Sequence, residues 1–308
     1  MGRLDTVALL AIGSLMMALK PLLLHLTREV DGAVMPPEQF QLAAEVVKLL
    51  SCGLALAGRR VLGMPAPLWR GVRHSAPFAI PAAVYLLMNV LTVRAARLLA
   101  PPVFQLVANL KIICTAVASW ALLSRRLVPA QWLALVLLTA GVALGQWPGA
   151  GSAEGQGSPS ALGVLLMAAN SCLSAMGGVL TEKLLKGAVS SELSIFATNV
   201  HMAAHTLLVN CLALGAQGLV WSPAWPSARV AVALANEAVN GILISVLMRR
   251  LDSIAKNFAF SASVFLTAGL SASLLNYRPP LQFFMGATLA TLAVLLFARP
   301  GNPKGKRQ

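Results

Sequence analysis

Long apolar runs, each of roughly twenty residues, constrain the fold of this chain more than any other feature. The hydrocarbon core of a bilayer is about 30 Å thick, and a helix that rises 1.5 Å per residue crosses it in about 20 residues. Only 11% of the 308 residues are charged and 57% are hydrophobic, whereas soluble domains carry about 25% charged residues. Ten-residue alternating strands of the membrane-barrel kind are absent from the sequence. The sequence therefore predicts an all-α protein that spans the lipid bilayer.

The pattern of apolar runs predicts ten transmembrane helices. They are expected over Thr6–Leu26, Phe40–Ala57, Pro77–Leu99, Val103–Leu123, Val128–Trp147, Ala161–Leu184, Leu193–Gln217, Arg229–Met248, Ile254–Leu275 and Leu281–Ala298. Charged residues and Pro21 interrupt the first two runs, so a count of eight or nine helices is the alternative.

The distribution of basic residues predicts the orientation. An even number of helices places both termini on one side, and most of the 24 lysines and arginines fall on that side. The opposite loops carry only Arg28, Arg97, Arg229 and Arg278. The positive-inside rule then makes both termini, including the basic tail 299–308, cytosolic. The net charge of +14 reflects this topology, and no nucleic-acid partner is expected because the sequence lacks a basic and aromatic RNA-binding pattern.

A segment rich in Gly and Ser, residues 148–160, reads as a flexible lumenal connector and divides the chain into two halves. Residues 1–147 and 161–298 would each hold five helices, and an odd number gives the halves opposite orientation in the membrane. An offset of 152 residues places Arg126 on Arg278 and Pro148-Gly149 on Pro300-Gly301. We therefore expect two inverted five-helix repeats.

Two lysines lie in or against predicted spans, Lys111 in the fourth and Lys256 beside the ninth. A cation at membrane depth costs several kcal/mol and usually meets a partner, yet the spans hold few acids, chiefly Glu45 and Glu237. Glu45 and Lys48 are three residues apart and are predicted to neutralise each other. An anionic solute is the expected partner of Lys111, whereas Lys256 could equally be an ordinary flanking lysine that follows the capping pair Asp252-Ser253.

Polar side chains accompany these lysines on common helix faces. Gln105 and Asn109 are four residues apart, as are Tyr85 and Asn89 in the third span. Amides can bind a base or a sugar, and a lysine supplies a point charge for a phosphate. Buried Asn and Tyr side chains can also simply bridge helices, so both readings stay open.

The cysteines and histidines suggest no metal or redox centre and no cofactor. Cys52, Cys114, Cys172 and Cys211 lie within apolar runs without metal-ligand spacing, so we expect packing roles. His201 and His205 share a helix face, but two ligands alone are a weak indication of a metal site. Paired carboxylates and Ser-His-Asp arrangements at a shared depth are also lacking, which argues against a membrane enzyme.

Ordered motifs along nearly the whole chain resemble the nucleotide-sugar transporters. They are Glu45-Val46-Val47-Lys48-Leu49, Phe104-Gln105 with Asn109-Leu110-Lys111-Ile112, Gln146-Trp147, Glu182-Lys183 with Lys186, Asn199-Val200-His201, Asn240-Gly241, and Arg250-Leu251-Asp252-Ser253-Ile254-Ala255-Lys256. The match is to the branch of CMP-sialic acid and UDP-galactose transporters, within the drug/metabolite transporter superfamily.

The resemblance implies a Golgi antiporter that exchanges a cytosolic CMP- or UDP-sugar for a lumenal nucleoside monophosphate by alternating access. It implies phosphate binding by Lys111 and Lys256. The remaining implied binding residues contact the base, ribose or sugar: Tyr85, Asn89, Gln105, Asn109, Asn199 and Ser245.

Departures from the family pattern at Val90, Phe104 and Ala203 leave the base and sugar open. Two alternatives remain, a sugar-phosphate translocator of the same superfamily, which would act in a plastid envelope, and a non-transporting scaffold that retains the fold. The sequence does not decide whether the chain forms a homodimer.

Overall fold

Helices make up the regular secondary structure throughout the part of the chain that the computed structural model describes, namely residues 3–31, 37–64, 75–99, 101–146, 160–187, 193–216, 227–274 and 280–297. No strand occurs in these ranges, so the all-α prediction is confirmed. The connector up to residue 159 and the basic tail lie outside the described residues.

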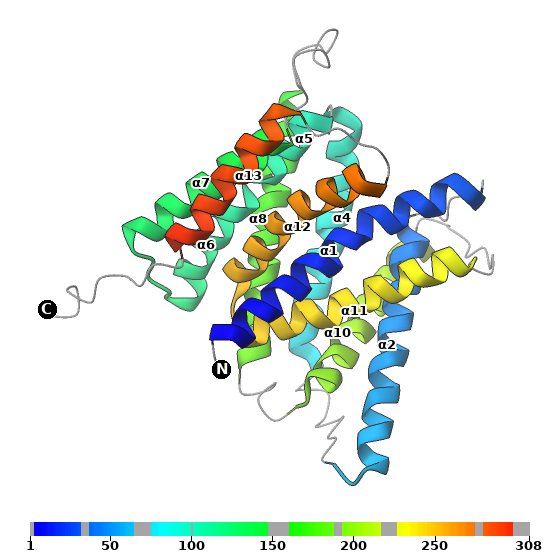
Figure 1. The fold of residues 1–308 in the computed structure, drawn as a ribbon. Coiled ribbons are helices and arrows are strands. Elements are labelled where there is room, and N and C mark those ends of the chain that lie inside the picture. Colours follow the sequence, from blue (N-terminus) through cyan, green and yellow to red (C-terminus); the bar gives the residue numbers. More distant parts are fainter. Residues whose placement is uncertain are drawn as a thin grey trace, which may run out of the picture. The chain divides into compact units, whose positions relative to one another are not determined.

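The helices follow the order of the predicted spans (Figure 1). They are α1 (Arg3–Asp31), α2 (Pro37–Val61), the 3₁₀ helix η1 (Ala76–Phe78), α4 (Ala79–Leu98), α5 (Pro101–Ala108), α6 (Lys111–Leu123), α7 (Pro129–Gly145), α8 (Ala161–Lys186), α10 (Ile195–Ala216), α11 (Ala228–Arg250), α12 (Ser253–Leu274) and α13 (Leu281–Phe297).

Seven stretches among the described residues are long and apolar enough to cross a membrane. They are Asp5–Leu23, Gln39–Val61, Ala76–Leu98, Leu106–Leu123, Ala161–Lys186, Ile195–Ala213 and Ala228–Arg250. Two further apolar helices, α7 and α13, are shorter. The chain is therefore a multi-pass membrane protein.

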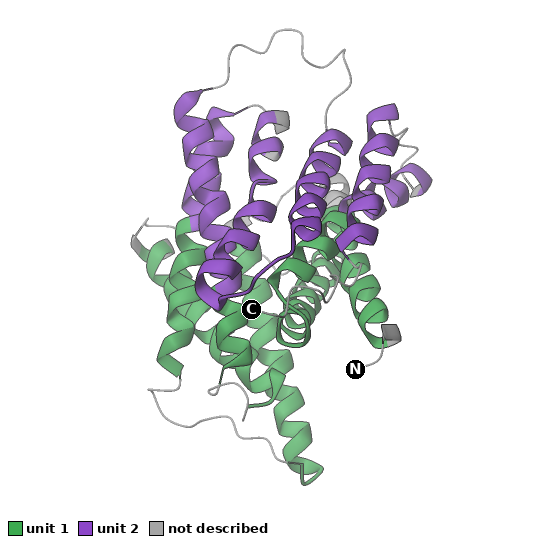
Figure 2. Ribbon diagram, turned by 90° about the vertical axis from the view of Figure 1, so that its left-hand side faces the viewer, with its two compact units in different colours: residues 1–87, 180–263 green, residues 88–179, 264–308 purple. Residues whose placement is uncertain are grey.

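The chain forms two compact units, which Figure 2 shows in different colours. The first unit comprises residues 1–87 and 180–263, and the second comprises residues 88–179 and 264–308. Each unit thus takes helices from both predicted halves, 1–147 and 161–298. Compactness and sequence repetition are different properties, so the predicted repeat remains a prediction.

In the first unit, α1 packs along α11, and α2 packs against both α10 and α11. Leu56 of α2 meets Leu193 and Ala197 in a buried apolar cluster. Gly13 of α1 lies against Leu247 of α11, where an added Cβ would meet the leucine Cδ1 at 2.7 Å. Small residues at such crossings let helix backbones approach, which is a main source of attraction between helices in lipid.

In the second unit, α7 and α13 lie side by side along their length (Figure 1). A Cβ built on Gly286 of α13 would meet the Gly145 backbone, its N at 2.5 Å and its Cα at 2.7 Å. A Cβ on Gly141 would likewise meet the Ala290 N at 2.9 Å. The two backbones are therefore in direct contact, and glycine is required at Gly286 because any side chain would separate the helices.

Candidate functional site

The predicted binding residues divide between the two units. Tyr85, Asn199, Ser245 and Lys256 belong to the first unit. The second unit holds Asn89, Gln105, Asn109 and Lys111. Each group is described within its own unit.

A tight turn interrupts the fourth predicted span of the second unit. The sequence predicts a continuous helix over Val103–Leu123, but α5 ends at Ala108 and α6 begins at Lys111. The N–H of Asn109 bonds to the Leu106 carbonyl at 3.3 Å, and the N–H of Leu110 bonds to the Val107 carbonyl at 3.1 Å. Bonds to the third preceding residue define a 3₁₀ turn, which within a longer helix often marks a functional position.

Side chains of α8 and of the α7 cap hold this turn. Ser171 of α8 is 1% exposed, and its hydroxyl donates to the Val107 carbonyl at 3.0 Å. Asn109 is 2% exposed, and its Nδ2 donates to Gln146 Oε1 at 3.4 Å. Interrupted helices persist at membrane depth only where neighbouring groups satisfy the backbone in this way. Ser171 and Gln146 are therefore supporting residues that the sequence analysis did not assign to the site.

Lys111 is consequently the first residue of α6 and not an interior one, and its side chain is half-buried. The amino end of a helix carries a partial positive charge from the aligned peptide dipoles. An ammonium group at that end adds to the same positive potential, so the two together favour an anion.

Lys256 lies in the first turn of α12 in the first unit, and its side chain is half-buried. The predicted cap is confirmed, because Asp252 Oδ1 accepts the N–H of Ala255 at 2.6 Å. Glu182 Oε2 accepts the N–H of Ser253 at 2.7 Å. Carboxylates of the chain itself thus already occupy these backbone donors of α12, and the Lys256 ammonium is the group left to meet an external anion.

Glu182 and Lys186 of α8 form a clasp around the connection between α11 and α12. The Glu182 side chain is 3% exposed, and its Oε1 lies 2.7 Å from Lys186 Nζ. Lys186 Nζ also donates to the Leu251 carbonyl at the end of α11. One acid and one base therefore bind both sides of the corner that leads to Lys256. The pair appears in the sequence motif Glu182-Lys183 with Lys186, but nothing in the spacing indicates its partners on α11 and α12.

Three other lysines in the helices of the first unit, Lys20, Lys48 and Lys186, are paired with acids. Lys20 Nζ lies 2.7 Å from Glu237 Oε1, which joins α1 to α11. Lys48 Nζ lies 2.6 Å from Glu45 Oε2, so the predicted neutralisation within α2 is confirmed. Within the described residues, no ion pair holds Lys256. It thus differs from these three lysines, and its half-buried position distinguishes it from the exposed Lys183.

Asn199 and Ser245 meet between α10 and α11. Ser245 Oγ lies 2.9 Å from Asn199 Oδ1 and 3.0 Å from the Gly241 carbonyl, and both side chains are buried. Asn199 Nδ2 donates to the Ile195 carbonyl at 2.9 Å. Glu237, Gly241 and Ser245 follow one another at four-residue intervals, so they lie on one face of α11.

The remaining predicted residues lie on α4 and α5. Tyr85 is half-buried and Asn89 is exposed, and they share one stripe of α4. The backbone of Gln105 lies in α5, but its side chain falls outside the described part.

His201 and His205 bind a serine near the start of the third span. Ser75 Oγ lies 3.0 Å from His201 Nδ1 and 3.0 Å from His205 Nε2, and Phe78 stacks on the His201 ring. These contacts tie α10 to the start of the third span. The four cysteines are free thiols, with Cys114 and Cys172 sulfurs 3.6 Å apart. No group of three metal-binding side chains occurs in the part of the chain that the structure describes.

The family model for nucleotide-sugar transporters matches residues 6–298, almost the entire chain. The chain belongs to the nucleotide-sugar transporter family. Among curated relatives, CMP-sialic acid transporter 1 of Oryza sativa subsp. japonica is 30% identical over 76% of this chain and 74% of its own length. The probable UDP-sugar transporter protein SLC35A4 of Sus scrofa is 33% identical over 87% and 86%.

A solved crystal structure shares the fold of this transporter. Its TM-score is 0.72 at 15% identity, over 96% of this chain and 97% of that one. That likeness concerns the fold alone. Family membership makes the chain a transporter and not an enzyme, in agreement with the absence of a catalytic arrangement in the sequence.

Proposed function

We propose that this transporter exchanges a cytosolic CMP- or UDP-sugar for a lumenal nucleoside monophosphate in the Golgi membrane, with both termini cytosolic. The observation that carries the proposal is Lys256, a half-buried ammonium at the start of α12 that no carboxylate of the described residues neutralises. A nucleotide phosphate supplies the missing charge. The relatives named for CMP-sialic acid and UDP-sugars support this substrate class.

Lys111 is proposed as the second phosphate ligand, because its ammonium and the amino end of α6 raise the positive potential together. Arginine and lysine bind phosphate strongly when partly desolvated, and lysine does so as a point charge. Around the phosphates, Tyr85 would stack on the base. Asn89, Gln105, Asn109, Asn199 and Ser245 would contact the ribose or sugar.

Asn199 and Ser245 must exchange an internal bond for a substrate bond, since they are bonded to each other in this structure. Ser245 has a single hydroxyl proton and two nearby acceptors, so it can turn between them at little cost. We therefore propose that Asn199 and Ser245 recognise the ribose or sugar through hydrogen bonds, and that the lysines attract the phosphate.

Exchange follows from the electrostatics of the lysines. An empty carrier that reoriented would carry the uncompensated Lys256 ammonium through the membrane, at a cost of several kcal/mol. A carrier loaded with a nucleotide sugar or a monophosphate is neutralised and reorients more readily. Obligatory exchange by alternating access is the consequence.

Two inverted repeats of five helices would supply the alternating movement. The packing inside the units supports this arrangement. Helices α2 and α10, the second and seventh predicted spans, pack together, as do α7 and α13, the fifth and tenth. The first and eighth spans pack as α1 and α11, while Asn170 of α8 donates to Thr92 of α4 at 3.1 Å, joining the sixth and third. If each span is replaced by its counterpart in the other half, five spans away, the same four pairs result.

Ligand-induced stabilisation of the purified protein tests the substrate class. CMP, UMP, GMP, AMP and inorganic phosphate are added at equal concentration, and the melting temperature is measured. A ligand at 100 times its Kd stabilises the native state by about 2.7 kcal/mol. We expect CMP or UMP to raise the melting temperature and inorganic phosphate to leave it unchanged. Stabilisation by inorganic phosphate alone would favour the sugar-phosphate translocator, and no response to any nucleotide would favour the scaffold.

A further inference from the structure

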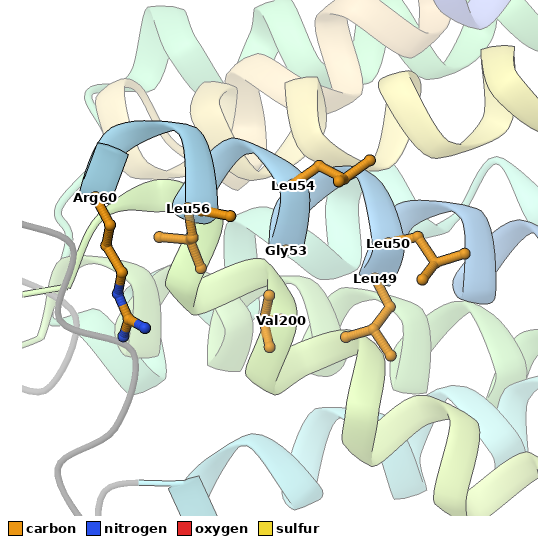
Figure 3. A pocket seen from close by; sticks show the side chains of 8 residues that line it. Leu49, Leu50, Gly53, Leu54, Leu56, Arg60 and Val200 are labelled. Atoms are coloured by element: carbon orange, nitrogen blue, oxygen red, sulfur yellow. The ribbon is translucent and has the colours of Figure 1, made fainter. Parts of the chain in front are cut away.

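A groove with a volume of about 380 Å³ lies on the first unit between α2 and α10. Figure 3 shows leucines along α2, with Leu49 toward one end, Arg60 at the other, and Val200 of α10 facing them. The volume falls in the range of small-molecule sites, about 300–1,000 Å³. Neither the predicted binding residues nor the family match accounts for this groove.

The groove exists because α2 carries small residues where its neighbours are large. Gly53 and Ala57 line it, and a Cβ built on Gly53 would meet nothing within 4 Å. Leu56, 4% exposed, lies beneath them in the buried cluster with Leu193 and Ala197. The groove therefore lies on the surface of a well-packed core and is not a cavity left by poor packing.

The sides of the groove carry exposed leucines within a predicted membrane span. Leu50 is 60% exposed and Leu54 is 74% exposed, within a stretch of α2 that is apolar enough to span a bilayer. From Leu49 to Arg60 the helix makes three turns, which corresponds to about 16 Å. One leaflet contributes half of the roughly 30 Å of hydrocarbon. The length of the groove thus matches the hydrocarbon depth of a single leaflet.

Arg60 places a positive charge at one end of this apolar groove, in the last turn of α2. Within the described residues no hydrogen bond or ion pair engages its guanidinium. The proposed orientation places this end at the cytosolic leaflet, whose anionic lipids attract basic residues near the membrane surface. A guanidinium can bind a phosphate through two parallel N–H donors.

We propose that this groove binds an anionic glycerophospholipid, with an acyl chain along Leu49, Gly53 and Leu56 and the headgroup phosphate on Arg60. Lipid tails are as apolar as leucine, so the groove by itself selects no headgroup. Selectivity comes from the charge of Arg60. One basic residue near the surface corresponds to roughly a fivefold preference for an anionic over a zwitterionic lipid.

Native mass spectrometry of the full chain tests the proposal, with palmitoyl-oleoyl phosphatidylserine and the matching phosphatidylcholine added in equal amounts. We expect wild type to retain phosphatidylserine about fivefold more often than phosphatidylcholine. Arg60→Gln should remove the preference, and Gly53→Leu should remove the bound lipid by filling the groove. Gly58→Leu is the matched control, because Gly58 also lies on α2 with nothing within 4 Å and does not line the groove.

Equal retention of the two lipids by wild type would overturn the proposal, as would an unchanged lipid preference in Arg60→Gln. The same loss of lipid in Gly58→Leu as in Gly53→Leu would overturn it too. A wild-type dimer that Gly53→Leu converts to a monomer would also overturn it, because a second copy of the chain would then occupy the groove. Since Arg60→Gln leaves the apolar packing intact, it decides the question even if a leucine variant is unstable.

Discussion

Replacement of Glu182 by alanine should release the start of α12 and weaken substrate binding through Lys256. The carboxylate is 3% exposed, and its two oxygens bind Lys186 and the Ser253 N–H, each at 2.7 Å. Alanine leaves the Ser253 N–H, on a residue that is 0% exposed, without this acceptor. Loss of such a charge-assisted bond costs about 1.5–3 kcal/mol.

The ion pair with Lys186 adds less, because that lysine side chain is 38% exposed and water can replace its partner. A pair of this kind contributes about 0.2–1 kcal/mol. We therefore expect Glu182→Ala to lower the free energy of unfolding by about 2–4 kcal/mol. Glu182→Gln keeps an acceptor for Ser253 and should lose about 1 kcal/mol.

Thermal unfolding in detergent and nucleotide-sugar uptake into proteoliposomes measure the two effects. Lys256 lies one turn beyond Ser253, so the apparent KM for substrate should rise in Glu182→Ala more than in Glu182→Gln. Lys183→Ala is the control, because Lys183 is an exposed neighbour in the same helix turn, and such substitutions stay within about 0.5 kcal/mol. Wild-type KM and melting temperature in Glu182→Ala would refute the idea that the clasp positions Lys256.

Two other substitutions test the second unit. Gly286→Leu should lower the melting temperature by about 2–10 °C, since overpacking costs about 1–3 kcal/mol. Gly269→Leu should not, because nothing lies within 4 Å of an added Cβ there. Equal melting temperatures of the two variants would contradict the backbone contact between α7 and α13. Ser171→Ala should raise the KM for substrate, because the Val107 carbonyl loses a hydrogen-bond donor at the turn before Lys111. Ser174→Ala, a neighbour on the same helix, should leave the KM unchanged. An unaltered KM in Ser171→Ala would show that this turn does not contribute to substrate binding.

Local sequence patterns predicted the features that depend on short spacing. The three-residue separation of Glu45 and Lys48 sufficed to predict their ion pair. Asp252 was predicted as a cap for α12, and it accepts the Ala255 N–H. The helices themselves follow from the length of the apolar runs.

Contacts between distant segments were beyond reach of the sequence. Lys20 pairs with Glu237, more than two hundred residues later, and no local pattern indicates this partner. The turn at Asn109 and Leu110 contains neither glycine nor proline, the usual indications of a break. It depends on Ser171 of α8, whose position only the tertiary structure supplies. Of the proposed site, the sequence predicted the cations but not the groups that hold them.

The most direct test of the account compares uptake of labelled CMP-sialic acid or UDP-galactose into proteoliposomes that are empty or preloaded with the matching monophosphate. Wild type should take up much more label when preloaded, because the Lys256 ammonium needs an anion on the return step. Lys256→Gln should reduce uptake to background under both conditions while the protein stays folded, and Lys183→Gln should behave like wild type. Near-normal, preload-dependent uptake by Lys256→Gln would contradict the claim that this ammonium binds the nucleotide phosphate.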